Sequence, residues 1–190
     1  CKKNNLACLI VSVYLDNLDD YLASHKLQEA INLAKSLDII VLYSEFFKLR
    51  NPSSGNFLSK GHLLKFKEII KKYKINILIF NNDLTPIQQR NLEKIFKLKV
   101  IDRTHLILEI FGKRAKTHEG KLQVELAHLL YQNSRLVKTW THLERQRGGF
   151  GFLGGPGETQ LELDKRMLSQ RIKKIKSLLL KIENTRSMQS

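Results

Sequence analysis

The sequence lacks long apolar runs and is poor in cysteine. The longest apolar stretch, Leu6–Val13, is about half of the roughly 20 residues that a membrane-spanning helix needs. No segment near the start is apolar enough for a signal peptide, and no initiator Met is present, which indicates a piece of a longer polypeptide. The two cysteines, Cys1 and Cys8, form neither a disulfide framework nor a metal-binding motif. We therefore expect a protein of the reducing cytoplasm.

Acidic residues are few compared with basic ones. The chain contains 33 Lys and Arg but only 18 Asp and Glu, so the formal net charge is +15. Residues 1–103 hold 17 basic and 10 acidic groups, and residues 104–190 hold 16 and 8, so neither half neutralises the other. Such an excess favours a polyanionic partner, either a nucleic acid or an anionic membrane surface. With 42% apolar residues the chain can still bury a core, which excludes general disorder.

The first half of the chain alternates apolar, β-branched runs with segments of helical periodicity. We predict strands at residues 6–15, 38–47, 75–80 and 98–101, and helices at residues 25–37, 61–74 and 85–97. The last of these helices has a well-marked start, because Thr85 and Gln88 can form a capping box around Pro86. Strands separated by helices pair in parallel through right-handed crossovers. The predicted fold class is therefore α/β, with a small parallel β-sheet flanked by helices in residues 1–103.

The second half, residues 104–190, shows no strand pattern. A short helix is expected at residues 105–116, and two heptad seams follow. The first seam consists of Leu122, Leu126, Leu129, Asn133, Leu136, Trp140 and Leu143, and the second of Leu161, Leu168, Ile172, Ile175, Leu179 and Ile182. Two such seams joined by a loop predict a long antiparallel α-helical hairpin resembling a coiled coil, with arms of roughly 40 Å. In it Asn133 would set the register, and Thr159 with Glu162 would cap the second helix.

A glycine-rich segment, residues 147–158, separates the two seams and is the predicted tip loop. A flexible connector needs fewer residues, and the G-x-G-x-x-G match at residues 149–154 lacks the preceding strand of a dinucleotide site. Arginine and aromatic side chains beside bare backbone amides suit RNA. The predicted RNA-contacting residues are Arg145, Arg147, Gly148, Gly149, Phe150, Gly151, Phe152, Gly154, Gly155 and Gly157 at the tip, and Lys173, Lys174 and Lys176 on the second arm.

Little else in the sequence carries chemistry. The six histidines have no metal-binding spacing, and we predict no catalytic residue and no metal ligand. Asn81, Asn82 and Asp83 follow a predicted strand, at the edge of the sheet where α/β folds bind ligands, although a loop or capping role is the simpler interpretation. The residues alone thus indicate a binding module.

Several segments resemble the N-terminal region of HflX-type GTPases. The resemblance rests on Val100–Leu136, which contains Asp102-Arg103-Thr104, and on Arg147–Arg166. Residues 57–68 and 81–96 also resemble the family, and the match is weak only before residue 57. It implies an α/β subdomain and a helical hairpin, followed by a GTPase domain that binds GTP and Mg²⁺. It also implies association with the ribosome, chiefly the large subunit and its RNA, in dissociation or rescue under stress. No P-loop, D-x-x-G or N-K-x-D motif occurs here, so we expect the GTPase domain after residue 190 and no cofactor in this chain.

Two functional hypotheses follow. The first is a cytoplasmic, monomeric ribosome-binding module of an HflX-like GTPase, which contacts ribosomal RNA through the hairpin tip and basic faces. The alternative is a nucleotide-binding α/β domain with its own ATP or GTP hydrolase activity, so whether this chain is itself an enzyme stays open. Peripheral contact with a membrane also stays open, because an anionic lipid surface attracts the same charge.

Overall fold

The structure is a computed structural model that describes residues 6–14, 19–146 and 160–189, with side chains described up to residue 136 and again at residues 162–188. The chain forms two compact units, Cys1–Lys113 and Arg114–Ser190. The sequence places a boundary between residues 103 and 104, whereas the structure divides the chain ten residues later. The reason is that Leu106 and Ile110, in the helix after residue 102, are buried in the core of the first unit.

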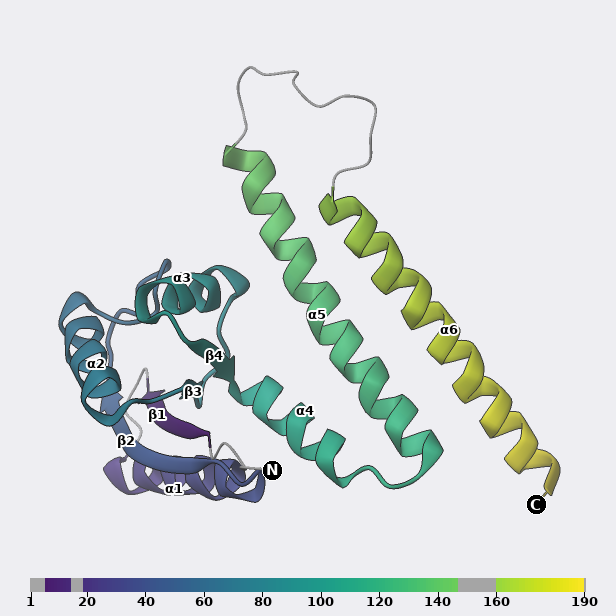
Figure 1. Ribbon diagram of the computed structural model, residues 1–190, viewed down its shortest axis with the longest axis horizontal. Coiled ribbons are helices and arrows are strands. Elements are labelled where there is room, and N and C mark those ends of the chain that lie inside the picture. Colours follow the sequence, from purple (N-terminus) through teal and green to yellow (C-terminus); the bar gives the residue numbers. More distant parts are fainter. Residues whose placement is uncertain (1–5, 15–18, 147–159, 190) are drawn as a thin grey trace. The chain divides into compact units, whose positions relative to one another are not determined.

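The first unit is a parallel sheet with helices on both faces (Figure 1). Its elements are β1 (Ala7–Tyr14), α1 (Asp20–Ser36), β2 (Ile40–Lys48), α2 (Lys60–Tyr73), β3 (Ile77–Phe80), α3 (Pro86–Phe96), β4 (Lys99–Asp102) and α4 (Arg103–Arg114). The strands pair in the order β2-β1-β3-β4, and every pairing is parallel. This confirms the predicted α/β class.

Successive residues of the central strands serve opposite faces of the sheet. Leu9 and its alternate neighbours pack against α2 and α3, where Phe66 and Leu92 are fully buried. Cys8 and its alternate neighbours pack against α1 and α4, where Ala30 is fully buried. Because both faces are covered, the strands read as continuous apolar runs, as parallel strands do.

The helix starts follow from side-chain caps. The capping box predicted for α3 is present: Thr85 Oγ1 accepts from the Gln88 backbone N–H at 3.2 Å, and Gln88 Oε1 accepts from the Thr85 N–H at 3.0 Å. Helix α1 begins five residues before the predicted start at residue 25, because Asp19 is its N-cap and accepts from the Tyr21 N–H. The apolar periodicity located the helix from Leu27 on but missed its first turn, which contains the buried Ala23.

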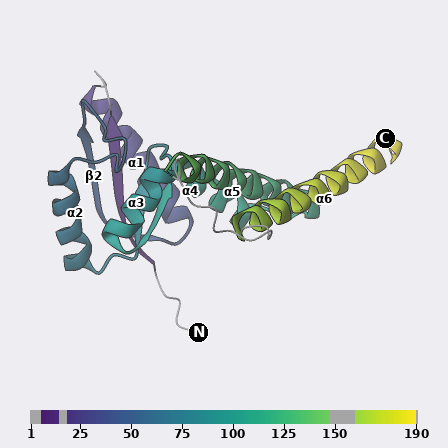
Figure 2. The same ribbon diagram turned by 90° about the horizontal axis from the view of Figure 1, so that it is seen from above.

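The second unit contains two long helices, α5 (His118–Gln146) and α6 (Gln160–Gln189), which lie side by side in Figures 1 and 2. Their seam is formed by Leu122, Leu126 and Leu129 on α5 and by Leu168, Ile172, Ile175, Leu179 and Ile182 on α6. Two ion pairs show that the helices are antiparallel, since Glu119 pairs with Arg186 while Glu125 pairs with Arg171. The predicted hairpin is thereby confirmed.

Three of the sequence predictions for this unit fall outside the described side chains: the seam positions Trp140, Leu143 and Leu161. The cap residue Thr159 lies outside the described residues altogether. Within the described part of the chain, no helix combines the length and the apolar character needed to cross a membrane.

Candidate nucleic-acid interface

The three lysines predicted to meet RNA lie on the outer surface of α6. Lys173, Lys174 and Lys176 are all exposed, while the intervening Ile175 and the preceding Ile172 are buried against α5. The helix therefore uses one face for packing and leaves its ammonium groups in solvent. Such an arrangement can bind phosphates without disturbing the seam, because all three lysine side chains are exposed while the seam residues are buried.

The predicted tip contacts cannot be placed in the same way. Arg145 belongs to α5, but its side chain lies outside the described residues. The remaining tip residues, Arg147, Gly148, Gly149, Phe150, Gly151, Phe152, Gly154, Gly155 and Gly157, also lie outside the described ranges. A role for them in binding RNA stays a prediction.

The carboxyl-terminal edge of the sheet, where the alternative hypothesis would place a nucleotide, has its polar groups already engaged. Asn82 Oδ1 accepts from the Val13 N–H at 2.8 Å, and Asn82 Nδ2 donates to the Val13 carbonyl at 2.6 Å. The amide side chain thus continues the hydrogen-bonding ladder of β1. Asn82 thereby ties the loop after β3 to the end of β1.

Asn81 makes a second set of bonds at the same edge. Its Nδ2 donates to Ser12 Oγ at 3.2 Å and to the Lys26 carbonyl at 3.1 Å, and its Oδ1 accepts from Arg103 Nη1 at 2.8 Å. Arg103 Nη2 in turn pairs with Glu29 at 2.7 Å. Strand order reverses between β1 and β3, which is where α/β sheets bind ligands. Here both amide atoms of Asn81 are used by the protein itself.

The Asp102-Arg103-Thr104 element has a structural explanation that sequence reasoning missed. Asp102 is almost fully buried, and its Oδ1 accepts from the His105 N–H at 2.9 Å, so it caps the start of α4. Arg103 links Asn81 to Glu29, and Thr104 Oγ1 donates to Asp83 Oδ1 at 3.0 Å. The cap could have been predicted, because Asp102 directly precedes a predicted helix. The bonds of Arg103 and Thr104 could not, because their partners are distant in the sequence.

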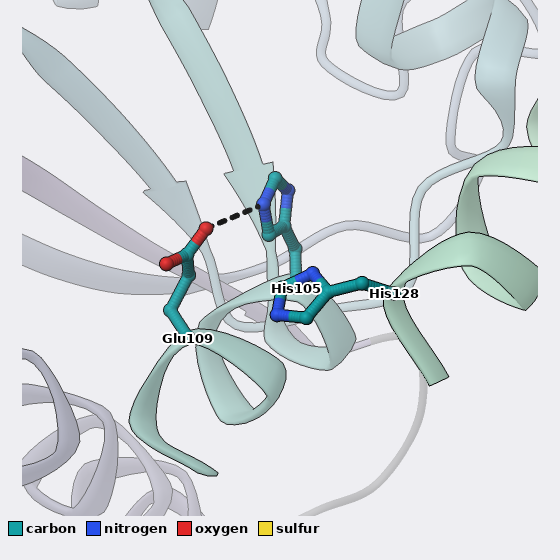
Figure 3. Close-up of side chains that lie close together, drawn as sticks. All are labelled: His105, Glu109 and His128. Carbon is teal, nitrogen blue, oxygen red and sulfur yellow. Dashed lines mark hydrogen bonds and ion pairs between the residues drawn. The ribbon is translucent and has the colours of Figure 1, made fainter. Parts of the chain in front are cut away.

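His105 also bonds within the protein itself, to Glu109 of the same helix (Figure 3). Its Nε2 lies 3.1 Å from Glu109 Oε1, one turn along α4. Burial lowers the pKa of His105 below its ordinary value, and the positive charge of Lys99 adds to this, although Glu109 opposes it. Burial is the largest of these influences, so the ring is neutral at neutral pH and its Nε2–H donates to the Glu109 carboxylate.

Comparison with known proteins matches most of the chain. The family model described as "GTP-binding GTPase N-terminal" matches residues 24–112, and "GTP-binding GTPase Middle Region" matches residues 114–190. A "GTPase HflX" of Escherichia coli is 47% identical over 160 residues, covering 84% of this chain and 37% of that protein. A "GTPase HflX" of Magnetococcus marinus is 47% identical over 163 residues, covering 86% and 38%. The chain thus spans less than two fifths of these curated relatives.

Solved structures show the same fold. A GTP-binding protein from Sulfolobus solfataricus in complex with GDP matches with a TM-score of 0.64 at 24% identity, covering 94% of this chain and 46% of that one. A complex of SsGBP with GDP matches with a TM-score of 0.69 at 22% identity, covering 97% and 46%. At this level of identity the likeness concerns the fold alone.

Proposed function

Because this chain belongs to the HflX family of GTPases, of which it holds the N-terminal and middle regions, we propose that it is a ribosome-binding module that contacts RNA of the large subunit. The observation that carries the proposal is the outer face of α6, where Lys173, Lys174 and Lys176 are exposed beside a buried seam. A net charge of +15, spread over both halves, supports a polyanionic partner of this kind.

The length of the two hairpin helices supports the proposal. Helices of 29 and 30 residues, held together along an apolar seam and by ion pairs, form an extended and narrow element. Such an element can enter a crevice in a large ribonucleoprotein that a globular domain cannot. We propose that it carries residues 147–158 toward ribosomal RNA, and that the complete protein acts in the cytoplasm by dissociating or rescuing ribosomes under stress.

GTP and Mg²⁺ would be held by a GTPase domain of the complete protein. The 190 residues contain no P-loop sequence, so no residue of this chain is assigned to either ligand. The alternative placed a nucleotide at the carboxyl-terminal edge of the sheet or in the glycine-rich segment. The first location loses support, because Asn81 and Asn82 bond to Ser12 and Val13, and the second lies outside the described residues. We expect no saturable micromolar binding of labelled ATP or GTP to this chain. Such binding would revive the alternative.

The decisive experiment is co-sedimentation of the chain with purified large ribosomal subunits at one fixed salt concentration. The test variant reverses the α6 charges (Lys173→Glu, Lys174→Glu and Lys176→Glu). The matched control reverses three exposed lysines of the first unit (Lys26→Glu, Lys60→Glu and Lys67→Glu), which changes the net charge equally.

We expect the α6 variant to lose at least tenfold in affinity, about 1.4 kcal/mol, while the control loses much less. Circular dichroism should show unchanged helicity, since the seam residues are intact. Equal losses in both variants would mean that only net charge matters, and no loss in the α6 variant would contradict the proposal.

A further inference from the structure

Six lysines gather at the amino-terminal edge of the parallel sheet, opposite to the edge where such folds bind ligands. We call them the lysine rim: Lys71, Lys72, Lys74, Lys94, Lys97 and Lys99. All six are exposed. The first three belong to the end of α2 and its C-cap, the next two to the end of α3 and its C-cap, and the last begins β4.

The fold brings these separate segments together. Helices α2 and α3 pack on the same face of the sheet and lead directly into β3 and β4, which are neighbours. Ile77, the first residue of β3, is paired with Lys99, the first residue of β4. Adjacent strands lie about 4.8 Å apart. The turns that hold Lys74 and Lys97 therefore stand side by side at one edge.

The rim carries no compensating negative charge of its own. Residues 71–74 and 94–99 contain no Asp or Glu. The flanking Glu93 keeps its negative charge but is tied to β4, because its Oε1 accepts from the Val100 backbone N–H at 3.2 Å. Asp83 and Asp102, in contrast, lie at the opposite edge, after β3 and at the end of β4. At the β3 and β4 end of the sheet the lysines therefore gather at one edge and these two aspartates at the other. Asp38 also lies at the amino-terminal edge, before β2, where it pairs with Lys113.

Two of the lysines occupy backbone positions that do not suit them. Lys74 has φ 51° and ψ 48°, and Lys97 has φ 55° and ψ 37°, so each ends its helix in the left-handed conformation. Glycine is the usual residue there, because a Cβ is disfavoured. The helix dipole accounts for Lys71, Lys72 and Lys94 in the last turns, but it does not account for lysine in place of glycine at the caps.

We propose that the lysine rim binds the phosphate backbone of RNA, as a contact surface in the first unit that is additional to the lysines of α6. Lysines kept at strained caps, on a rim without acidic residues, fit a polyanion that neutralises several of them together. Tyr73 adds an aromatic surface, since it is 40% exposed and Lys72 Nζ lies 5.4 Å from its ring centroid.

RNA suits this surface better than a lipid bilayer does. Insertion into a membrane surface combines basic charge with an exposed apolar face, as in an amphipathic interfacial helix. The apolar neighbours of the rim are used inside the unit, since Ile75 is 6% exposed and Phe96 is 7% exposed. The rim therefore offers charge with little apolar surface to insert. The inference rests on the proposed ribosomal RNA partner, but it concerns different residues.

The test uses the full 190-residue chain with Lys74→Gly and Lys97→Gly. Glycine adopts the left-handed conformation without steric cost, so the melting temperature should stay equal or rise. The probe is a fluorescent RNA duplex of 20 base pairs, titrated between 50 and 200 mM salt. Affinity should fall by about tenfold at the lowest salt, and the slope of log K against log salt should decrease by roughly 1.5, for two lost phosphate contacts.

The matched control is Lys60→Gln with Lys67→Gln, which removes two exposed charges from α2 but none from the rim. It should lose clearly less affinity and keep more of the slope. Wild-type affinity and slope in the rim variant would overturn the inference, as would an equal loss in the control. Vesicles containing 30% phosphatidylserine form a further arm, and loss of vesicle binding alone would assign the rim to membranes and overturn it too. Failure of the rim variant alone to weaken RNA binding leaves the α6 test of the proposed function unaffected.

Discussion

Replacing Asn82 with alanine tests whether the carboxyl-terminal edge of the sheet is a structural fastening or a ligand site. The side chain forms two hydrogen bonds with the backbone of Val13, at 2.8 Å to the N–H and 2.6 Å to the carbonyl. Val13 is 3% exposed, so its polar backbone groups have little access to water once the amide is gone. Asn82→Ala therefore leaves a donor and an acceptor without partners in a buried strand.

The size of the effect follows from this geometry. A buried polar group that loses its partner costs about 1–3 kcal/mol, and two such groups cost less than their sum where water reaches the end of the strand. We expect Asn82→Ala to destabilise the first unit by about 2–4 kcal/mol, which corresponds to a fall in Tm of roughly 10 °C for a unit of this size.

The assay is thermal unfolding followed by circular dichroism, with Asn81→Ala as the matched control. Asn81 bonds to the buried Ser12 and to Lys26 and Arg103, whose bonding groups lie nearer the surface. Its loss should therefore cost about 1–2 kcal/mol, less than that of Asn82. If Asn82→Ala unfolds at the same temperature as the parent chain, the amide does not fasten the strands, and the edge is again open to a ligand.

Four further outcomes are expected from other parts of the chain. Ile175→Ala in the hairpin seam should cost about 2–5 kcal/mol by leaving a cavity, measured by urea unfolding. Asn133→Leu should stabilise the hairpin by about 1–3 kcal/mol, because Asn133 Oδ1 is buried without a partner among the described residues; no gain would show that the amide is satisfied. Burial lowers the pKa of His62 and His105, so the unfolded chain takes up protons first and stability should fall as pH drops below about 6.5; a flat profile would contradict this. Burial raises the pKa of Cys8 to about 12, so its thiol should resist alkylation at pH 8 until the unit unfolds.

Local signals in the sequence were sufficient for the elements of the fold. The capping box at Thr85, the apolar runs of the strands and the leucine spacing of α5 each depend on residues within a few positions of one another. The structure confirms all three. These signals are short-range, so physical chemistry along the chain determines them before any tertiary contact forms.

The candidate sites could be predicted only in part. The exposure of Lys173, Lys174 and Lys176 followed from the heptad pattern, because the seam positions fix which face of α6 is outside. The bonds of Asn82 to Val13 join residues 69 positions apart, and they depend on strand order, which no local pattern encodes.

The lysine rim was hidden for the same reason. Its lysines occur in two separate stretches that become adjacent only because β3 and β4 are neighbours. The left-handed conformation of Lys74 and Lys97 gave no sequence signal either, because glycine or asparagine would normally mark such a position.

The salt dependence of binding to isolated large ribosomal subunits tests the central claim most directly. If lysines on α6 and elsewhere neutralise RNA phosphates, log K for the 190-residue chain should fall linearly with log salt between 50 and 200 mM, with a slope of roughly 0.7–0.9 for each contact. Reversal of Lys173, Lys174 and Lys176 should reduce that slope by roughly 2–3. An affinity that does not change with salt, or a slope that the reversal leaves intact, would contradict the proposal that this chain is a ribosome-binding module that contacts RNA.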